Sequence, residues 1–421
     1  MAGTFVTEAD ARPATPTAVV SAEAPDPYRW VILVVLWITY IVVFLNRLSV
    51  GPLGAFFKTE LRITSAQVGL VLSCASLGYL CTQIPIGWLA DRIGARWPIA
   101  IGELIAGLAM LSLFFAPSYR ALLFFMFITG AGCGFLAPST TQAVIVWFPQ
   151  QERATVMGFK QTAVNLGGMA GAAFLPAIAL AYGWRSGFLV LGVIALVVGL
   201  ASAILYRDPA VGPATSGSER RTPVVPLLDI LRNREIWLVA VGAFFLNWIE
   251  LAVIGHFVLY LKALQFPVVA AGGLLAMAEG AGAVARPVSG LVSDRLFGGL
   301  RNPVFMAFSA IATLMCLVLG LAGPRLGWLL YPVVFLLGIG AVGFGGVYLT
   351  LLSELGGRGG AAKAAGFGST IAVGGSIIGP PAFGHIVDVT GSYQVAWLSL
   401  AVVGVLSVTV LTFVNESSRK I

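Results

Sequence analysis

Three basic residues stand inside stretches of the sequence that are otherwise apolar: Arg47, Lys160 and Arg286. A charged side chain at the centre of a bilayer costs at least about 2.5–3.5 kcal/mol, so we expect each to face a partner or a wet cavity. The planar fork of arginine can donate two parallel hydrogen bonds to a carboxylate, and lysine adds a compact positive charge. These residue types predict a site for a small organic anion, such as a mono- or dicarboxylate or a sugar acid.

Each of the three cations also has a simpler interpretation. Arg47 is within about one turn of the end of its apolar run, so its side chain can extend to the lipid headgroups. Lys160 lies about two turns into its run and can reach the opposite interface in the same way. Arg286 can be the structural partner of an acid. The sequence alone leaves these alternatives open.

Carboxyl groups accompany the cations inside the apolar stretches. Glu279 and Arg286 are seven residues apart, so on a helix they share one face, about two turns from each other. We expect Glu279 and Glu250 to be proton-coupling residues that take up a proton as an anion arrives, and a permanent ion pair is the alternative for Glu279. Glu103 lies near the end of its stretch, where a structural role is expected.

Hydroxyl and amide side chains complete the predicted site. We expect Tyr79, Asn165 and Tyr348 to bind the substrate together with the three cations. Further candidates of the same character are Tyr40, Tyr260 and Ser369. The histidines do not have metal-ligand spacing, and the sequence has no nucleotide-binding loop or nucleophile elbow. We therefore expect no metal, no cofactor and no enzymatic activity.

The composition decides which elements must position these residues. Of the 421 residues, 58% are hydrophobic and only 10% are charged, whereas soluble domains carry about 25% charged residues. In lipid, backbone polar groups are satisfied only within helices or closed barrels. The apolar runs are about 20 residues long and do not alternate with polar residues, which indicates helices. We expect an all-α membrane protein, most simply a monomer in the bilayer, that does not bind nucleic acid.

Twelve apolar segments can be counted, with a longer polar interval between the sixth and the seventh. Their expected spans are Trp30–Val50, Ala66–Gly87, Trp97–Ala116, Ala121–Phe148, Ala154–Ala181, Gly187–Tyr206, Trp237–Leu261, Val268–Val292, Pro303–Leu321, Gly327–Leu352, Lys363–Val387 and Val395–Phe413. We expect a disordered cytoplasmic tail over 1–28, six-helix bundles over 29–206 and 236–421, and a cytoplasmic linker over 207–235. Fourteen basic residues in the loops, linker and tail on the side of both termini, against six in the opposite loops, predict cytoplasmic termini in an inner membrane.

A short charged turn occurs in both halves of the chain. It joins the second and third segments, and its residues are Gly87, Asp91, Arg92, Gly94 and Arg96. It is partly repeated between the eighth and ninth segments as Asp294 and Arg295. Gly158-Phe159 and Gly366-Phe367 repeat at nearly the same offset. The repeats indicate duplicated halves, and the turn is expected to hold the bundles together in one state and release them in another.

Through this turn and the repeated pattern, the sequence resembles the major facilitator superfamily from Tyr28 to Phe413. The stretches around Arg47, Tyr79 and Gln83, Trp147 and Tyr182 are similar to those of its anion:cation symporter family, and the segment at Arg286 also resembles monocarboxylate and oxalate carriers. The resemblance implies alternating access and transport of sugar acids or other carboxylates, usually with protons. That family commonly has acids where this chain has Asn46 and Leu136, so exchange or uniport of an anion is an alternative. A multidrug exporter is another.

Overall fold

The computed structural model describes residues 26–208, 225–357 and 359–416. Within these ranges, twelve helical spans are long and apolar enough to cross a membrane, which confirms the predicted fold class. Most of the tail expected over 1–28 lies outside the described residues, as do 209–224 of the expected linker. The remainder of that linker contains a short helix, α9 (Leu227–Arg232).

The first six spans form one bundle. Its helices are α1 (Arg29–Leu48), α2 (Val50–Leu61), α3 (Ser65–Ile93), α4 (Arg96–Phe114), α5 (Tyr119–Gly134), α6 (Leu136–Trp147), α7 (Gln150–Tyr182) and α8 (Trp184–Leu205). The other six spans form the second bundle. Its helices are α10 (Arg234–Ala263), α11 (Val268–Leu296), α12 (Asn302–Ala322), α13 (Leu330–Val342), α14 (Gly345–Leu355), α15 (Ala361–Thr390) and α16 (Tyr393–Thr412), with two 3-10 turns before α13.

Three spans that the sequence suggested as single helices are interrupted. The first is divided into α1 and α2 at Ser49, the fourth into α5 and α6 at Phe135, and the tenth into α13 and α14 near Gly343. Proline occupies the third residue of α2 and of α6, where a missing N–H costs nothing because the first turn has no acceptor for it. The tenth span is interrupted at a glycine-rich stretch instead. Such interruptions leave backbone carbonyls free to bind side chains.

Each bundle has a phenylalanine–tryptophan contact between its first and fifth spans, stacked in the first bundle and edge-to-face in the second. In the first, Phe159 of α7 stacks on Trp37 of α1 with ring centroids 5.4 Å apart. In the second, Phe367 of α15 meets Trp237 of α10 at 4.9 Å. Both phenylalanines belong to the Gly-Phe pairs that repeat in the sequence. The duplicated pattern thus corresponds to a duplicated packing unit.

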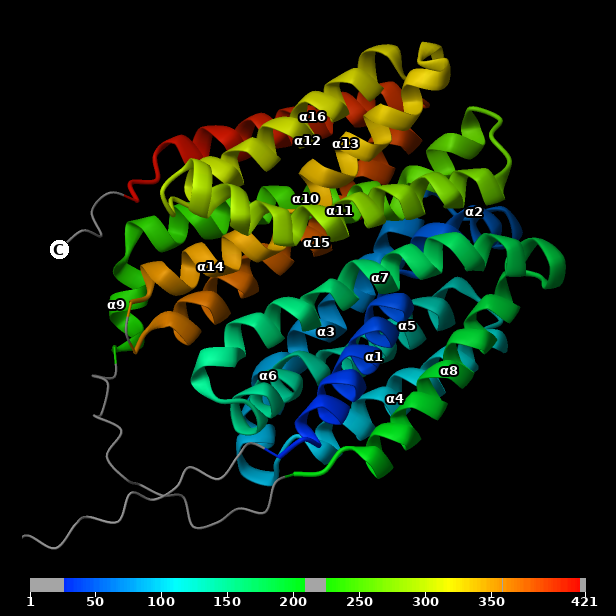
Figure 1. Ribbon diagram of the computed structural model, residues 1–421. Helices are drawn as coiled ribbons and strands as arrows, with labels where there is room; N and C mark the ends of the chain where they lie inside the picture. The colour runs from blue at the N-terminus through cyan, green and yellow to red at the C-terminus, as the bar shows by residue number, and fades with distance from the viewer. Residues whose placement is uncertain (1–25, 209–224, 358, 417–421) are drawn as a thin grey trace, which may run out of the picture.

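The bundles contact each other mainly at one end of the molecule. There α3 packs on α15, α7 on α11 and α2 on α10. At Gly69 of α3 an added Cβ would collide with the backbone of Pro380 in α15, so the two helices touch directly. We call this the α2 end, because α2 lies beside α10 there. Figure 1 shows that the bundles separate toward the opposite end, where α6 and α14 lie apart.

Candidate functional site

A row of aromatic and basic side chains crosses the interior of the first bundle. Lys160 of α7 donates to the Thr140 hydroxyl at 2.9 Å and lies 4.5 Å from the ring centre of Tyr40. Tyr40 interacts with Tyr79, and the Arg47 guanidinium lies 4.4 Å from the Tyr79 ring centre. A cation over an aromatic face is stabilised by the ring quadrupole. The row therefore links two basic side chains through two tyrosine rings inside the bundle.

Neither of these cations reaches a lipid headgroup. Arg47 is 6% exposed and donates to the Ser76 hydroxyl at 3.2 Å, and Lys160 is 2% exposed. Among the described residues neither forms an ion pair with an acid. Their direct contacts are with hydroxyl groups and ring faces, which leaves capacity to bind an anion.

Arg286 occupies the corresponding interior of the second bundle. Its Nε and Nη2 atoms both donate to the Val342 carbonyl at 3.3 Å, the last residue of α13. The interruption of the tenth span frees that carbonyl, and the glycine at 345 leaves room for the guanidinium, since an added Cβ would lie 3.2 Å from Cζ. Arg286 is partly exposed and forms no ion pair with a described residue.

The arginines of the two bundles act on the same central groups. Glu250 of α10 interacts electrostatically with both Arg286 and Arg47. The Tyr40 hydroxyl also lies within electrostatic range of Arg47 and Arg286. Tyr348, whose hydroxyl lies 3.3 Å from that of Ser369, interacts with Glu250, Tyr79 and Arg286. The structure thus brings together predicted residues from α1, α3, α10, α11 and α14.

Glu279 and Asn165 lie at the contact between bundles. The Asn165 amide donates to the Glu279 carbonyl at 3.4 Å. The Glu279 carboxyl is packed against Gly168 of α7, where an added Cβ would lie 2.7 Å from Cδ. Glu279 also interacts electrostatically with Glu250 and Arg286. It is therefore linked to the central group but buried against the opposite bundle. Glu103 is buried inside the first bundle beside Gly199.

The charged turn of the first bundle is built around a carboxylate that the sequence did not single out. Asp208, just beyond α8, accepts from the Ala95 N–H at 3.0 Å, at the start of α4. Gly94 is required there, because its φ is +84° and an added Cβ would meet the Asp208 carboxylate. Asp91 is exposed and bonds to no described residue.

The two arginines of this turn bind locally. Arg92 stacks on Trp88 at 3.7 Å, and Arg96 donates to the Ala203 carbonyl at 2.9 Å. Gly87 packs against Pro138 at the Cβ position. These contacts all lie within the first bundle. The contact between this turn and the second bundle that the sequence suggests therefore remains a prediction about another conformational state.

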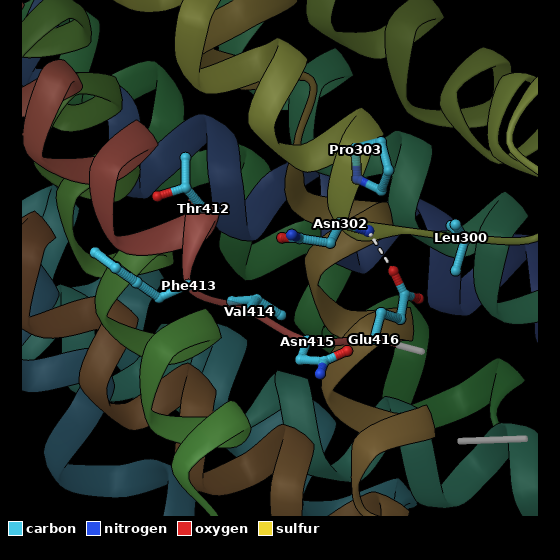
Figure 2. Close-up of a pocket in the computed structure, with 8 residues that line it drawn as sticks. All are labelled: Leu300, Asn302, Pro303, Thr412, Phe413, Val414, Asn415 and Glu416. Carbon is cyan, nitrogen blue, oxygen red and sulfur yellow. Dashed lines mark hydrogen bonds between the residues drawn. The ribbon is translucent and has the colours of Figure 1, made fainter. Parts of the chain in front are cut away.

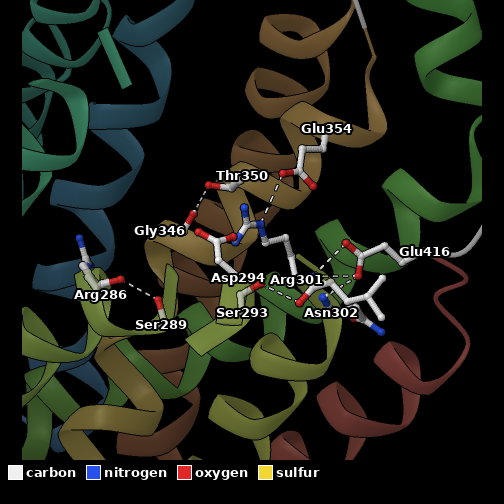
Figure 3. A network of polar contacts seen from close by, with 11 residues as sticks. Arg286, Ser289, Ser293, Asp294, Arg301, Asn302, Gly346, Thr350, Glu354 and Glu416 are labelled. Carbon is white, nitrogen blue, oxygen red and sulfur yellow. Dashed lines mark hydrogen bonds and ion pairs between the residues drawn. The ribbon is translucent and has the colours of Figure 1, made fainter. Parts of the chain in front are cut away.

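The second bundle has the same arrangement, shown in Figures 2 and 3. Glu416, just beyond α16, accepts from the backbone N–H groups of Arg301 and Asn302 at 2.9–3.0 Å and so caps α12. Arg301 pairs with Asp294 at 2.6 Å and with Glu354 at 3.4 Å. Asp294 is therefore engaged, whereas the exposed Arg295 has no ion pair with a described residue.

A cluster at the α2 end joins the bundles through hydrogen bonds. The Asp388 carboxylate of α15 accepts from the N–H groups of Ser65 and Ala66, both at 2.8 Å. His256 Nε2 of α10 lies 3.1 Å from the Ser65 carbonyl oxygen, and Lys58 donates to the Ser65 hydroxyl at 2.6 Å. We call these five residues the Ser65 clasp. Sequence reasoning missed Asp388, because one acid near the end of a span has no distinctive spacing.

Twelve spans in two equivalent bundles, with basic groups from both acting on one centre, define a membrane transport protein. The sequence model of the Major Facilitator Superfamily matches residues 36–380. This chain belongs to that superfamily, as the sequence predicted, and its members are transporters rather than enzymes.

Several curated relatives are similar to most of this chain. A probable sulfoacetate transporter of Cupriavidus necator is 27% identical over 92% of this chain and 94% of its own length. The hexuronate transporter of Bacillus subtilis is 24% identical over 91% and 94%. The D-galactonate transporter of Escherichia coli O6:H1 is 31% identical over 48% and 46%.

Among solved structures, a bacterial homologue of the human lysosomal transporter Spinster, in an inward-facing and occupied conformation, superposes with a TM-score of 0.78. It is 17% identical and covers 94% of this chain and 98% of its own length. At that identity the likeness establishes the fold alone.

Proposed function

We propose that this protein is a secondary active transporter of a small organic anion and moves it by alternating access between the two bundles. The observation that carries the proposal is that Arg47 and Arg286, from opposite bundles, both act on Glu250 and Tyr40. A ligand held by both arginines would bridge the bundles, so their relative movement would be coupled to its binding. The relatives named for sulfoacetate, hexuronate and D-galactonate are consistent with a carboxylate or sugar acid.

The state of the structure fits an opening toward the cytoplasm. The bundles are joined at the α2 end, and the basic residues of the loops are concentrated on the side of both termini. By the positive-inside rule that side is cytoplasmic, in the inner membrane of a bacterium. The anion would then enter or leave the central group between α6 and α14.

Proton coupling follows from competition for the arginines. An ionised Glu250 interacts with Arg47 and Arg286, and an incoming carboxylate would require the same positive charges. Protonation of Glu250 would release them, so one proton would accompany one anion. Glu279, which interacts with both Glu250 and Arg286, would be a second proton acceptor. Without this competition the protein would instead exchange anions or carry one alone.

Transport by purified protein in liposomes tests the proposal. Uptake of labelled mono-, di- and sugar carboxylates is measured with an inward proton gradient, and counterflow of the same anion is measured without a gradient. We expect Arg47→Ala and Arg286→Ala each to lower both activities by at least about tenfold, because a charged hydrogen bond contributes about 1.5–3 kcal/mol. Arg120→Ala, at an exposed arginine at the start of α5, is the matched control and should be unchanged.

The outcomes separate the possible functions. Saturable, gradient-driven uptake that requires both arginines supports proton symport, and counterflow without a response to the gradient indicates exchange or uniport. Saturable efflux of a lipophilic cation that survives Arg286→Ala would indicate an exporter and refute the proposal. Absence of carboxylate flux under every gradient would also refute it.

A further inference from the structure

The short helix α9 stands at the boundary of a membrane-spanning helix. One residue, Asn233, separates the end of α9 from the start of α10, and its extended backbone gives the two helices different axes. Helix α10 has 30 residues. At about 1.5 Å per residue it spans about 45 Å, the thickness of a bilayer with its headgroups. Helix α9 therefore lies at the level of the headgroups, and Figure 1 shows it at the end of the second bundle opposite α2.

Two contacts fix the orientation of α9 on the second bundle. The Ile230 side chain is buried beside Gly360, where an added Cβ would lie 3.2 Å from Ile230 Cδ1. The Trp237 indole of α10 donates to the Leu231 carbonyl at 2.7 Å. Trp237 is itself exposed, and tryptophan near the end of a span is typical of the headgroup region. The outer surface of α9 is thus continuous with the surface at Trp237.

That outer surface of α9 is apolar. Leu227, Leu228 and Leu231 are 55%, 54% and 36% exposed. At 100° per residue, the three leucines and Ile230 occupy one continuous arc of about 160°, and the polar side chains of α9 occupy the remainder. A helix divided in this way at headgroup level lies in the plane of the interface, with its apolar face among the acyl chains.

Two arginines accompany this apolar face. Arg232 ends α9 and Arg234 begins α10. Both are exposed, and neither forms an ion pair with a residue that the structure describes. A guanidinium donates two parallel hydrogen bonds to phosphate oxygens, and each basic residue near an anionic membrane surface adds to the attraction. The charge of this segment therefore complements a lipid phosphate.

We propose that α9, together with Arg232, Arg234 and Trp237, is a binding site for an anionic phospholipid in the leaflet on the side of both termini. The leucines enter the acyl region, and the arginines bind the headgroup phosphate. A free phosphate would satisfy the arginines but would leave the leucines in water. The continuity with Trp237 and the positive charge favour lipid over the first bundle or a second copy of the chain. This inference does not depend on which solute the protein carries.

Spin-label accessibility distinguishes the possible occupants of the apolar face. In a variant without the four native cysteines, in liposomes of phosphatidylcholine and phosphatidylglycerol, a label at Leu227 is compared with one at Asp229, the matched control on the opposite face of α9. We expect the ratio of oxygen to nickel-chelate accessibility to be at least about threefold higher at Leu227. High nickel accessibility at both positions would place the leucines in water and overturn the proposal. Low accessibility to both reagents at Leu227 would mean that protein covers this face, which would also overturn it.

Native mass spectrometry tests the headgroup preference. The protein in detergent is titrated with phosphatidylglycerol or phosphatidylcholine. We expect Arg232→Gln and Arg234→Gln each to weaken phosphatidylglycerol binding about fivefold and to leave phosphatidylcholine binding unchanged. Arg325→Gln, at an exposed arginine in the turn before α13, is the matched control and should bind as the parent does. Equal phosphatidylglycerol binding by the parent and both variants would refute the site, and so would displacement of the lipid by inorganic phosphate.

Discussion

The strength of the Ser65 clasp can be tested by removing the Asp388 carboxylate. That group accepts two backbone N–H bonds at 2.8 Å from the first turn of α3, so the second bundle caps a helix of the first. Asp388→Ala removes both bonds when the bundles are closed, and removes nothing when they are separated. The variant should therefore favour the state that is open at the α2 end.

The magnitude follows from known capping energies. Replacing an N-cap side chain with alanine costs about 0.5–2 kcal/mol, and a negative charge at a helix N-terminus contributes about 0.3–1 kcal/mol. Asp388 lies at the surface, where water weakens such interactions, so we take the total as about 1–2 kcal/mol. The ratio of closed to open molecules should fall about 5- to 30-fold. Asp388→Asn keeps one acceptor oxygen without the charge and should give a smaller shift.

Spin-label distances measure this ratio. Labels at Leu70 and Ala263 report the α2 end, and labels at Ile93 and Ala362, also exposed, report the opposite end. The four native cysteines are first replaced, because Cys81 is exposed and would also be labelled. We expect Asp388→Ala to lengthen the first distance and shorten the second. If both distributions match the parent while the protein still transports, the carboxylate does not hold the bundles together.

Three further changes have defined outcomes. Gly69→Ala places a methyl group against the Pro380 backbone, so it should open the α2 end in the same spin-label experiment without lowering expression; an unchanged closed state would contradict the contact. In Gly94→Ala the new side chain has an unfavourable φ of +84° and lies against the Asp208 carboxylate, so the melting temperature should fall by several degrees. In Gly87→Ala the nearest contact of the new side chain is 3.6 Å away, so the melting temperature should not change. Lys160→Met should weaken anion binding at least about tenfold with little loss of melting temperature, measured by ligand-induced thermal shift; equal binding would place the lysine outside the site.

The number and type of helices could be predicted from the sequence. A helix needs about 20 consecutive apolar residues to span the lipid, and this requirement is local. Each span can therefore be predicted from its own segment of the sequence. The repeated Gly-Phe pairs also indicated the duplication, which corresponds to the paired contacts of Phe159 and Phe367. The interruptions at Ser49, Phe135 and Gly343 were not predicted, because proline and glycine are also tolerated inside unbroken membrane helices, as Pro85 and Pro176 are here.

The direction of each charged side chain was decided only by the tertiary structure. A helix turns 100° per residue, so small differences in helix orientation decide whether Arg47 faces lipid or the Tyr79 ring. Asp388 and Ser65 are 323 residues apart, and their contact depends on how two bundles dock. The sequence by itself determined that costly charges lie in membrane helices and that the fold is duplicated. Which charges meet was determined by packing between helices, because hydropathy is a property of segments and contact is a property of surfaces.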